Sequence, residues 1–400
     1  MFASTERRIE LDERRELKTA SAVAEQLGQM KGALMKLGQM ASYLDEGLPE
    51  PMRMALAQLR SGAPPMSAQL AAGVVEAELG SPPDELFVEW DPAPIAAASI
   101  GQVHRAIARH PDTGEETPVA VKVQYPGVDE AITADLKNAG MLGTILKQGF
   151  GGLDPDDMVA EIKERLAEEL DYRLEARNQA EFADYYRGHP YIHVPDVVPA
   201  YSSGRVLTSQ LVNGATWDEL LTWSRTERDL AAETIFRFVF RSLDFGLVKH
   251  FTPVEMHTFA SMVKAAAVDQ DPAGFRTILE GAGMLRPGAP VPTDQVGEYF
   301  SRFYEPVAES REMTWSGEYA SGIVRHTFDR ASPISQYATV PRAFVFIQRI
   351  NLGLYALLGE LGATGNYRRI AEELWPFTEA APSTDIGVAE AAWLAAHPRT

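Results

Sequence analysis

The stretch Thr117-Pro118-Val119-Ala120-Val121-Lys122-Val123 decides the fold, because it places one lysine inside an apolar, β-branched strand. Side chains of a strand alternate between its two faces, so Lys122 projects from the face opposite Val121 and Val123. An ammonium on a covered face needs an anionic partner, since it is costly to desolvate unpaired. Lys122 is therefore expected to clamp nucleotide phosphates, or else to point to water from an edge strand. The strand alone does not separate these two alternatives.

A run of small side chains lies one hairpin before this strand. Ala96-Ala97-Ala98-Ser99 sits within the predicted connection Pro94–Gln102, between strands expected at Phe87–Trp90 and Ser99–Ala108. Small residues let backbone N–H groups approach phosphate oxygens closely, although alanine is stiffer than glycine. We expect Ala96, Ala97, Ala98 and Ser99 to contact a nucleotide; the alternative is a plain tight turn.

The remaining pattern predicts an α+β chain with two lobes. Turn residues at His110–Gly114 predict that the last two strands form a hairpin. An apolar stripe predicts a long helix over Pro155–Tyr186, and further strands are expected at Ile192–Val198 and Arg205–Val212. After residue 213 the pattern is almost wholly helical to Phe377. A small antiparallel sheet with one helix, followed by bundled helices, is typical of an α+β fold.

Four parts follow from this order. Residues 1–80 form an N-terminal helical extension, residues 81–213 the lobe with the sheet, residues 214–379 a helical lobe, and residues 380–400 a loose tail.

The chain has no cysteine, which excludes disulfides and thiolate metal sites and fits a cytoplasmic location. Its net charge of −19 makes nucleic acid an unfavourable partner. No run is long and apolar enough to span a bilayer, because polar residues interrupt the nearest candidate, Ala343–Leu358.

Two further motifs are ambiguous on their own. Glu169 and Asp171 flank Leu170 on the predicted long helix and cannot point at one spot. One of them could pair with Lys122 or hold a metal, but the acidic neighbours Glu164, Glu168 and Glu175 also fit a solvated face. In Lys36-Leu37-Gly38-Gln39, the lysine and glutamine lie one helical turn apart, which in isolation indicates only a surface.

Taken together, these strings resemble the UbiB/AarF (ADCK-type) atypical kinases, a family associated with isoprenoid quinone biosynthesis. Lys36–Gln39 matches the KxGQ motif of that family, and Ala96–His104 matches its alanine-rich nucleotide loop. Val119–Gly127 matches the strand with its phosphate-binding lysine, and Glu169–Tyr172 matches its ExD motif. The resemblance extends from about Gln29 to Phe377.

The resemblance implies a protein-kinase-like, two-lobed fold with an N-terminal helical extension and a mostly helical C-lobe. In that family the KxGQ helix folds over the nucleotide site and obstructs docking of a protein substrate. By this resemblance, five residues of the two motifs are expected to belong to the site: Lys36, Gly38, Gln39, Glu169 and Asp171. The backbone of Leu211 and Val212 would form the hinge against an adenine edge. The cofactors implied are ATP or ADP with Mg²⁺.

The chain departs from the family where the catalytic loop should be. The family carries a string resembling HxDxHPxN before its metal-binding DFG, whereas here the predicted helix Ala231–Leu243 runs directly into Asp244-Phe245-Gly246. Roughly 20 residues are gone, comprising that loop and two short strands. Asp244 is expected either to bind metal as the DFG aspartate or to end a helix. In the second case Gly246 is a C-cap and Thr252–Glu255 is a capping box for the next helix.

The expected function is therefore that of an ATP- or ADP-binding pseudokinase linked to quinone-lipid metabolism. Phosphoryl transfer is expected to be impaired, because positioning and charge stabilisation dominate that reaction and the missing loop supplies residues for both. An active ATPase or small-molecule kinase is one alternative, and a non-enzymatic helical scaffold is another. The expected partners are an adenine nucleotide and lipid or quinone-pathway proteins. Any membrane contact is expected to be peripheral, at the inner membrane face.

Overall fold

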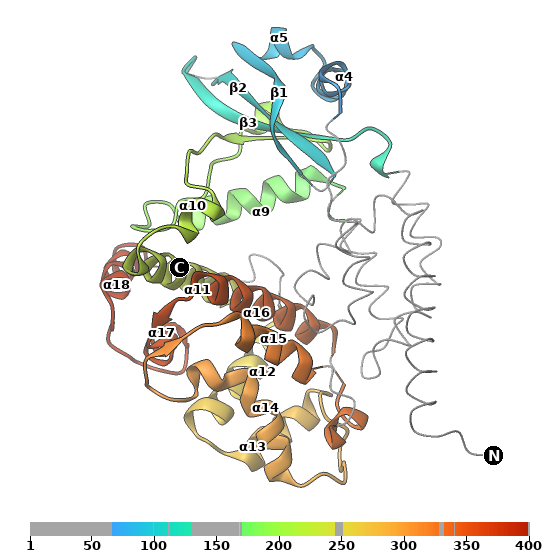
Figure 1. Cartoon of the computed structure of the whole chain (residues 1–400). Helices are drawn as coiled ribbons and strands as arrows, with labels where there is room; N and C mark the ends of the chain where they lie inside the picture. Colours follow the sequence, from blue (N-terminus) through green and yellow to red (C-terminus); the bar gives the residue numbers. More distant parts are fainter. Residues whose placement is uncertain are drawn as a thin grey trace, which may run out of the picture. The chain divides into compact units, whose positions relative to one another are not determined.

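The computed structural model describes residues 66–98, 100–110, 113–129, 168, 170–244, 251–327, 332–339 and 341–398 (Figure 1). The chain divides into two compact units. Among the described residues, unit 1 holds those up to 129, together with 168, 170–180 and 195–212. Unit 2 holds residues 181–194 and those from 213 onward.

Unit 1 is built on a four-stranded antiparallel sheet in the order β1-β2-β3-β4. The strands are β1 (Glu89–Ala97), β2 (Gly101–Arg109), β3 (Glu116–Gln124) and β4 (Val206–Gln210). The expected hairpin between β2 and β3 is confirmed, with Gly114 in the left-handed region at φ 72°. The helices of this unit are α4 (Ala68–Leu79), α5 (Pro83–Leu86), the start of α9 (Tyr172–Tyr185) and the short η2 (Pro199–Tyr201).

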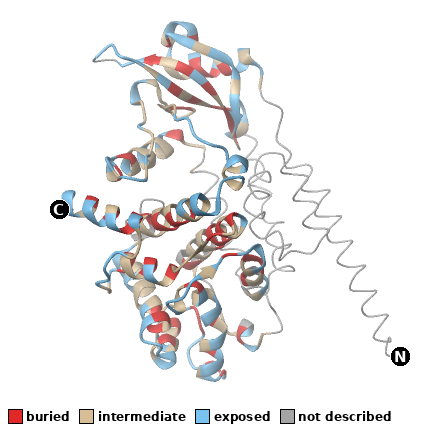
Figure 2. Cartoon of the chain, turned by 60° about the vertical axis from the view of Figure 1, so that its left-hand side comes forward, coloured by how far each residue is buried: buried red, intermediate tan, exposed pale blue. Residues whose placement is uncertain are grey.

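The two faces of this sheet differ in what covers them. Val119, Val121 and Val123 are fully buried and join the core that α4 covers through Val74 and Val75. Lys122 alternates with them and is only partly buried, as the strand pattern predicts. A second, smaller cluster contains Ile100, Leu207 and Tyr172, and Leu207 is the cross-strand neighbour of Lys122. Figure 2 shows this banding of buried and exposed residues along the strands. One face is therefore structural core, and the other carries the lysine.

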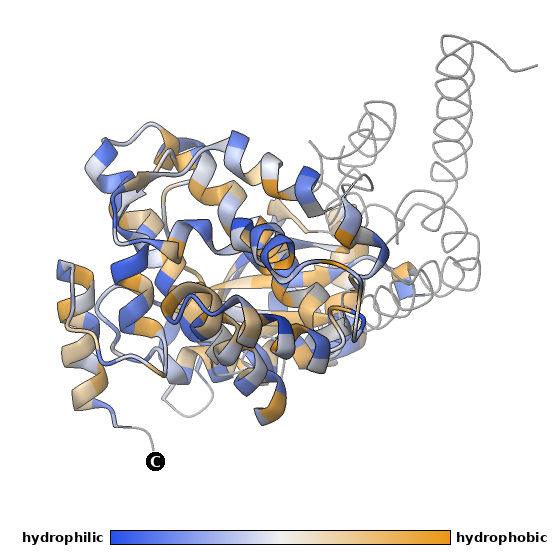
Figure 3. Cartoon of the chain, turned by 90° about the horizontal axis from the view of Figure 1, so that it is seen from below, coloured by the Kyte–Doolittle hydropathy of each residue, from blue (hydrophilic) through white to orange (hydrophobic). Residues whose placement is uncertain are grey.

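Unit 2 is almost entirely helical. Its helices are α10 (Trp217–Leu221), α11 (Arg225–Asp244), α12 (Pro253–Val263), η3 (Lys264–Val268), α13 (Pro272–Gly281), α14 (Thr293–Ala308), α15 (Gly317–Thr327), η4 (Pro333–Gln336), α16 (Arg342–Leu361), α17 (Tyr367–Leu374) and α18 (Asp385–Ala396). Two short strands, β5 (Met313–Thr314) and β6 (Thr364–Gly365), pair antiparallel. Hydrophobic and hydrophilic residues share each of the longer helices (Figure 3), as expected of helices packed around a core. Of the described helices, none is long and apolar enough to traverse a bilayer.

The start of α12 confirms one sequence expectation in detail. The Thr252 side chain accepts from the backbone N–H of Glu255, and the Glu255 carboxylate accepts from the N–H of Thr252 at 2.7 Å. Pro253 occupies the first helical position, where its missing N–H costs nothing. The α+β class with a mostly helical second unit is confirmed as well.

Three expectations were wrong. The strand predicted at Ile192–Val198 is reduced to a single bridge between Val197 and Ser209, so only one end of that stretch joins the sheet. The long helix predicted over Pro155–Tyr186 is not continuous, since residues 170 and 171 are not helical and α9 begins at Tyr172; residues 155–167 lie outside the described part. The loose tail predicted at 380–400 contains α18, whose Ile386 and Trp393 are buried.

Candidate nucleotide site

Lys122 has an acidic partner on α9. Its Nζ atom donates to both carboxylate oxygens of Glu175, at 2.7 Å each. The lysine side chain is 24% exposed and the glutamate 43% exposed, so water still reaches the pair. The Nζ atom also lies 4.6 Å from the ring centre of Tyr172, within range of a cation–π interaction. The ammonium is held by a charge and an aromatic face, while part of it stays open to a ligand.

Close packing brings β2, β3 and α9 together beneath this pair. A Cβ atom built on Gly101 would lie 2.8 Å from the Tyr172 hydroxyl oxygen and closer still to the carbonyl oxygen of Val123. Real Cβ atoms essentially never come so near. The absence of a side chain at Gly101 therefore lets Tyr172 approach the sheet beside Lys122.

The alanine-rich connection is shorter than expected. Ala96 and Ala97 end β1 and pair with Val103 and Gln102, so among the described residues only Ala98 precedes the turn itself. The backbone N–H of Ala98 donates to the Gly101 carbonyl at 2.8 Å and closes the hairpin tightly. Ala96 and Ala97 are exposed, so their small side chains leave this end of the hairpin accessible. Contact of these residues with a nucleotide remains a prediction, and Ser99 lies outside the described residues.

Two polar residues that follow this loop have a structural task. The carboxamide oxygen of Gln102 accepts from the backbone N–H of Met66 at 2.9 Å, and its nitrogen lies 2.9 Å from His104 Nε2. His104 Nδ1 lies 2.9 Å from the Asp91 carbonyl oxygen, so Nδ1 is the donor and Nε2 accepts from Gln102. Burial lowers the pKa of His104, which keeps the ring neutral. Gln102 and His104 fasten the segment before α4 to the sheet.

The acidic pair Glu169 and Asp171 does not supply the observed partner of Lys122. The Asp171 carboxylate accepts from the backbone N–H of Arg173 at 3.0 Å, which is the position of a cap at the start of α9. The Leu170 carbonyl beside it accepts from the Gln124 carboxamide at 3.1 Å. Asp171 and Leu170 thus fix where α9 begins, while the side chain of Glu169 lies outside the described residues.

Glu175 is the site residue that the sequence pattern does not single out. It is one of several acidic residues in this stretch, together with Glu164 and Glu168, which fit a solvated face equally well. One feature of the sequence does indicate its role. Glu175 lies about one helical turn after Asp171, so a helix capped by Asp171 places the Glu175 side chain on the face toward the sheet.

The predicted hinge continues the edge of the sheet. The Leu211 N–H donates to the Pro118 carbonyl at 3.0 Å, so this amide is committed to the backbone. Val212 follows it, 50% exposed and last in unit 1. An adenine edge would therefore have the Leu211 carbonyl and the Val212 backbone to bind, and the role of both residues remains a prediction.

The region of the missing catalytic loop is one uninterrupted helix. α11 extends from Arg225 to Asp244, so the helix predicted over Ala231–Leu243 is confirmed and includes the backbone of Asp244 as well. The side chain of Asp244 and residues 245–250 lie outside the described part of the chain, as do Lys36, Gly38 and Gln39. Within the described part, no group of three His, Asp or Glu side chains is arranged to hold a metal ion.

Comparison with known proteins now identifies the domain. Residues 58–243 match the family model described as the ABC1 atypical kinase-like domain. This part of the chain is therefore a domain of the UbiB/AarF type of atypical kinases. The family match ends at Leu243, one residue before Asp244.

Curated relatives of this family match over about half of the chain. The mitochondrial atypical kinase COQ8B of Danio rerio is 34% identical over 228 residues, which cover 56% of this chain and 35% of that protein. The mitochondrial atypical kinase COQ8 of Saccharomyces cerevisiae is 32% identical over 216 residues, covering 54% and 42%. A probable protein kinase UbiB of Marinobacter nauticus is 32% identical over 191 residues, covering 47% and 34%. The aligned part thus spans well under half of these relatives.

One solved structure matches far more of the chain. The complex of Rv3197 with erythromycin from Mycobacterium tuberculosis aligns with a TM-score of 0.62 and 28% identity. The alignment covers 93% of this chain and 100% of that one. The kinase-like, two-lobed α+β fold is thus shared over nearly the whole chain.

Proposed function

We propose that unit 1 binds an adenine nucleotide, with Lys122 on its phosphates, and that the chain transfers the γ-phosphate slowly or not at all. The Lys122–Glu175 pair carries this proposal, because a lysine held by a helix glutamate is the arrangement that protein kinases use to place nucleotide phosphates. The exposed, small-residue end of the β1–β2 hairpin supports it, since backbone groups there can approach phosphate oxygens.

Weak phosphoryl transfer follows from the same family comparison. A kinase needs an aspartate to orient the nucleophile and an asparagine to hold a second metal, and both come from the catalytic loop. The chain has no HxDxHPxN-like string, and α11 continues to Asp244 where that loop would branch off. Bound Mg²⁺ would neutralise charge on the phosphates, while Lys122 would hold the phosphate oxygens. Without the two loop residues, the rate should fall by several orders of magnitude.

We place the protein in or beside isoprenoid quinone metabolism, because its ABC1 atypical kinase-like domain is similar to those of the UbiB/AarF kinases. Contact with lipid, where it occurs, would be peripheral and made through apolar helix faces. A macrolide-like apolar ligand is a second candidate, favoured by the likeness to the Rv3197–erythromycin complex over 93% of this chain.

Titration calorimetry with ADP and ATP, with and without Mg²⁺, tests the proposal when combined with a phosphate-release assay. Nucleotide binding without turnover supports it. Mg²⁺-dependent hydrolysis would identify an active ATPase, and the absence of both activities would leave a helical scaffold. An erythromycin titration in the same series addresses the second candidate.

A further inference from the structure

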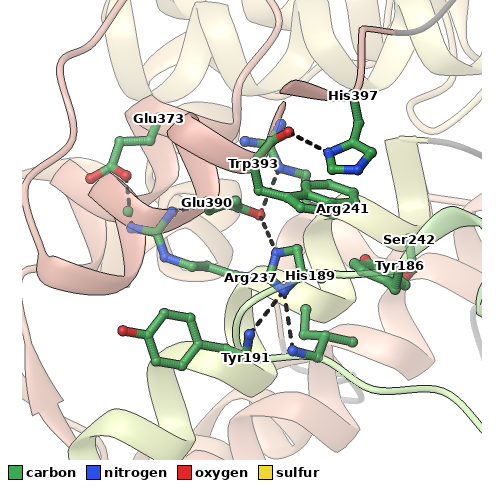
Figure 4. Close-up of polar contacts among 12 residues, drawn as sticks. Tyr186, His189, Tyr191, Arg237, Arg241, Ser242, Glu373, Glu390, Trp393 and His397 are labelled. Atoms are coloured by element: carbon green, nitrogen blue, oxygen red, sulfur yellow. Dashed lines mark hydrogen bonds and ion pairs between the residues drawn. The ribbon is translucent and has the colours of Figure 1, made fainter. Parts of the chain in front are cut away.

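Buried polar side chains fasten helices in each unit. In unit 2, Arg237 on α11 donates to Glu373 of α17 at 2.7 Å and to Glu390 of α18 at 2.9 Å (Figure 4). These three side chains are at most 6% exposed, so the arginine holds both helices against α11. In unit 1, a glutamine has a comparable place beside the candidate nucleotide site.

Gln124 is that residue, and it ends the strand that carries Lys122. It lies two positions after the lysine, so alternation turns both side chains to the same face of the sheet. Its cross-strand neighbour Gly101 faces the same way, toward the Tyr172 hydroxyl. Gln124 is only 1% exposed, although its side chain ends in a carboxamide. A buried amide on this face needs a hydrogen-bond partner.

The partner of Gln124 is the chain at the start of α9. Its carboxamide nitrogen donates to the Leu170 carbonyl at 3.1 Å, and α9 begins two residues later at Tyr172. The Tyr172 N–H donates to the Gly204 carbonyl at 3.0 Å. The next carbonyl, that of Arg205, accepts from the backbone N–H of Gln124, also at 3.0 Å. The end of β3, the turn before β4 and the start of α9 are thus joined at one point of unit 1.

Glu175 lies in the first turn of α9, three residues after Tyr172. Each helical residue advances the chain by ~1.5 Å and turns it by about 100°, so the start of the helix sets the position of this carboxylate. Leu170 is bonded to Gln124, and Glu175 is bonded to Lys122. A single strand therefore holds the entry of α9 through a hydrogen bond and its first turn through an ion pair.

A carboxamide occupies a place where an apolar side chain would fill the space equally well. The neighbouring residues Ile100, Tyr172 and Leu207 form an apolar cluster. Burying an amide among such residues costs desolvation free energy, which its hydrogen bond does little more than offset. What the hydrogen bond adds is direction, since it forms only over a narrow range of distance and angle. This chemistry favours placement of α9 over simple filling of a core.

We propose that Gln124 is a positioning residue of the nucleotide site, which fastens the start of α9 to the strand of Lys122 and so assembles the Lys122–Glu175 pair before a nucleotide binds. The inference rests on the proposed nucleotide binding for its functional meaning. Gln124 acts through Leu170 and Glu175. In protein kinases the placement of the helix that carries this glutamate controls activity, because the pair must be formed for catalysis. A helix fastened at its entry to the lysine strand lacks the freedom to break the pair, so here the pair is a permanent part of the site.

The test removes the reach of the Gln124 amide in the full chain. Gln124→Met keeps the length of the side chain without the N–H donor, and Gln124→Asn keeps the carboxamide but withdraws it by one methylene group. Gln179→Met is the matched control. The Gln179 carboxamide also donates to a backbone carbonyl, that of Pro195 at 2.9 Å, but it does so one turn beyond Glu175 on α9.

Three quantities are measured well below the unfolding midpoint of each variant. Calorimetry gives the affinities for ADP and for adenosine, which has no phosphates for Lys122 to hold. Hydrogen exchange is followed at the amides of residues 172–174, which are hydrogen-bonded at the entry of α9.

Both Gln124 variants should speed exchange at residues 172–174 by about five-fold or more in the ligand-free protein. They should weaken ADP binding by about three- to ten-fold and leave adenosine binding unchanged. Gln179→Met should match wild type in all three measurements. Adding Gln124→Met to Glu175→Gln should weaken ADP no further than Glu175→Gln does alone, because the pair that Gln124 positions is already lost.

A purely structural Gln124 gives a different pattern. ADP and adenosine would then weaken in parallel, or neither affinity would change, and either result overturns the proposal. It is also overturned if ADP slows exchange at residues 172–174 of the wild type far more than elsewhere in unit 1, since the nucleotide would then assemble the pair.

If wild type binds no ADP, the proposed function fails by itself. Exchange in the ligand-free variants then decides the positioning role. Faster exchange at residues 172–174 in the Gln124 variants but not in Gln179→Met upholds it, and equal exchange in all of them refutes it.

Discussion

The Nζ atom of Lys122 is equidistant from the two carboxylate oxygens of Glu175, at 2.7 Å from each, although the two residues are 53 positions apart in the chain. Both side chains retain contact with water, and ion pairs of this kind contribute at most about 1 kcal/mol to stability. The pair is therefore a poor stabiliser. Its value lies in holding an ammonium at a fixed point on the sheet face opposite the valine core.

Replacing Lys122 with alanine should weaken ADP binding about ten-fold, equivalent to the ~1.4 kcal/mol of one charge-assisted contact. The fold should tolerate the change, since the pair adds so little stability. Calorimetry measures the effect, with Arg109→Ala as the matched control. Arg109 is a cation on the same sheet that pairs with Glu116 at 2.8 Å and is 60% exposed. Equal ADP affinity in wild type and Lys122→Ala would refute the assignment of Lys122.

Gly101→Ala should destabilise the protein by about 1–3 kcal/mol, because the new methyl group would collide with the Val123 carbonyl and the Tyr172 hydroxyl. Gly73→Ala serves as the control. Gly73 lies in α4, and a methyl group added there would meet nothing within 4 Å. That variant should gain roughly 0.5–1 kcal/mol from helix propensity. Urea unfolding measures both, and a Gly101→Ala protein as stable as wild type would contradict the packing beside Lys122.

Acid should weaken unit 2 through Glu390. Burial raises the pKa of this carboxyl, but the nearby His189 N–H and the charges of Arg241 and Arg237 outweigh it and lower the pKa from 4.5 to about 2. Because the folded-state pKa is the lower one, the stabilisation is complete above pH 4.5 and is lost as the pH falls toward 2. Its size is about 3 kcal/mol.

Comparison with Glu390→Gln isolates this contribution from the other carboxylates. The difference in unfolding free energy between wild type and the variant should be largest near pH 6 and should shrink steadily below pH 4.5. A difference that stays constant between pH 6 and pH 3 would show that Glu390 is not held as a charged group.

Restoring the missing loop should switch on turnover. A family-like segment of roughly 20 residues between Leu243 and Asp244 would supply the absent aspartate and asparagine, and its strands would cover apolar surface at about 25 cal/mol per Å². Both the melting temperature and Mg²⁺-dependent ATP hydrolysis are expected to rise. A glycine–serine insert of equal length is the control and should raise neither. If the 400-residue chain already hydrolyses ATP as fast as the repaired one, the loop was never needed.

Lys122 could be placed from sequence because strand alternation is a local rule. Val121 and Val123 are fully buried and Lys122 is not, as a period of two requires. Its partner could not be chosen that way. Glu175 sits among several acidic residues, and the choice depends on where α9 begins, which Asp171 and the Gln124–Leu170 hydrogen bond determine. That information lies in tertiary contacts.

α18 escaped prediction for a different reason. Its buried face carries Ile386, Glu390 and Trp393 at helical spacing, so a carboxylate stands where an apolar residue would have completed the stripe. The position is buried because Arg237, 153 residues earlier, neutralises it. A pattern rule that equates charge with exposure cannot anticipate such a pairing.

The helical spacing within α9 restricts which changes in length this segment can accept. Glu175 and Phe182 lie on one helix, so the number of residues between them sets the angle between their side chains about its axis. One inserted or deleted residue would turn either side chain by about 100° with respect to the other and move it by ~1.5 Å along the axis. Substitutions in this stretch can be absorbed one at a time, but length variation should be excluded from it and confined to the connections on either side.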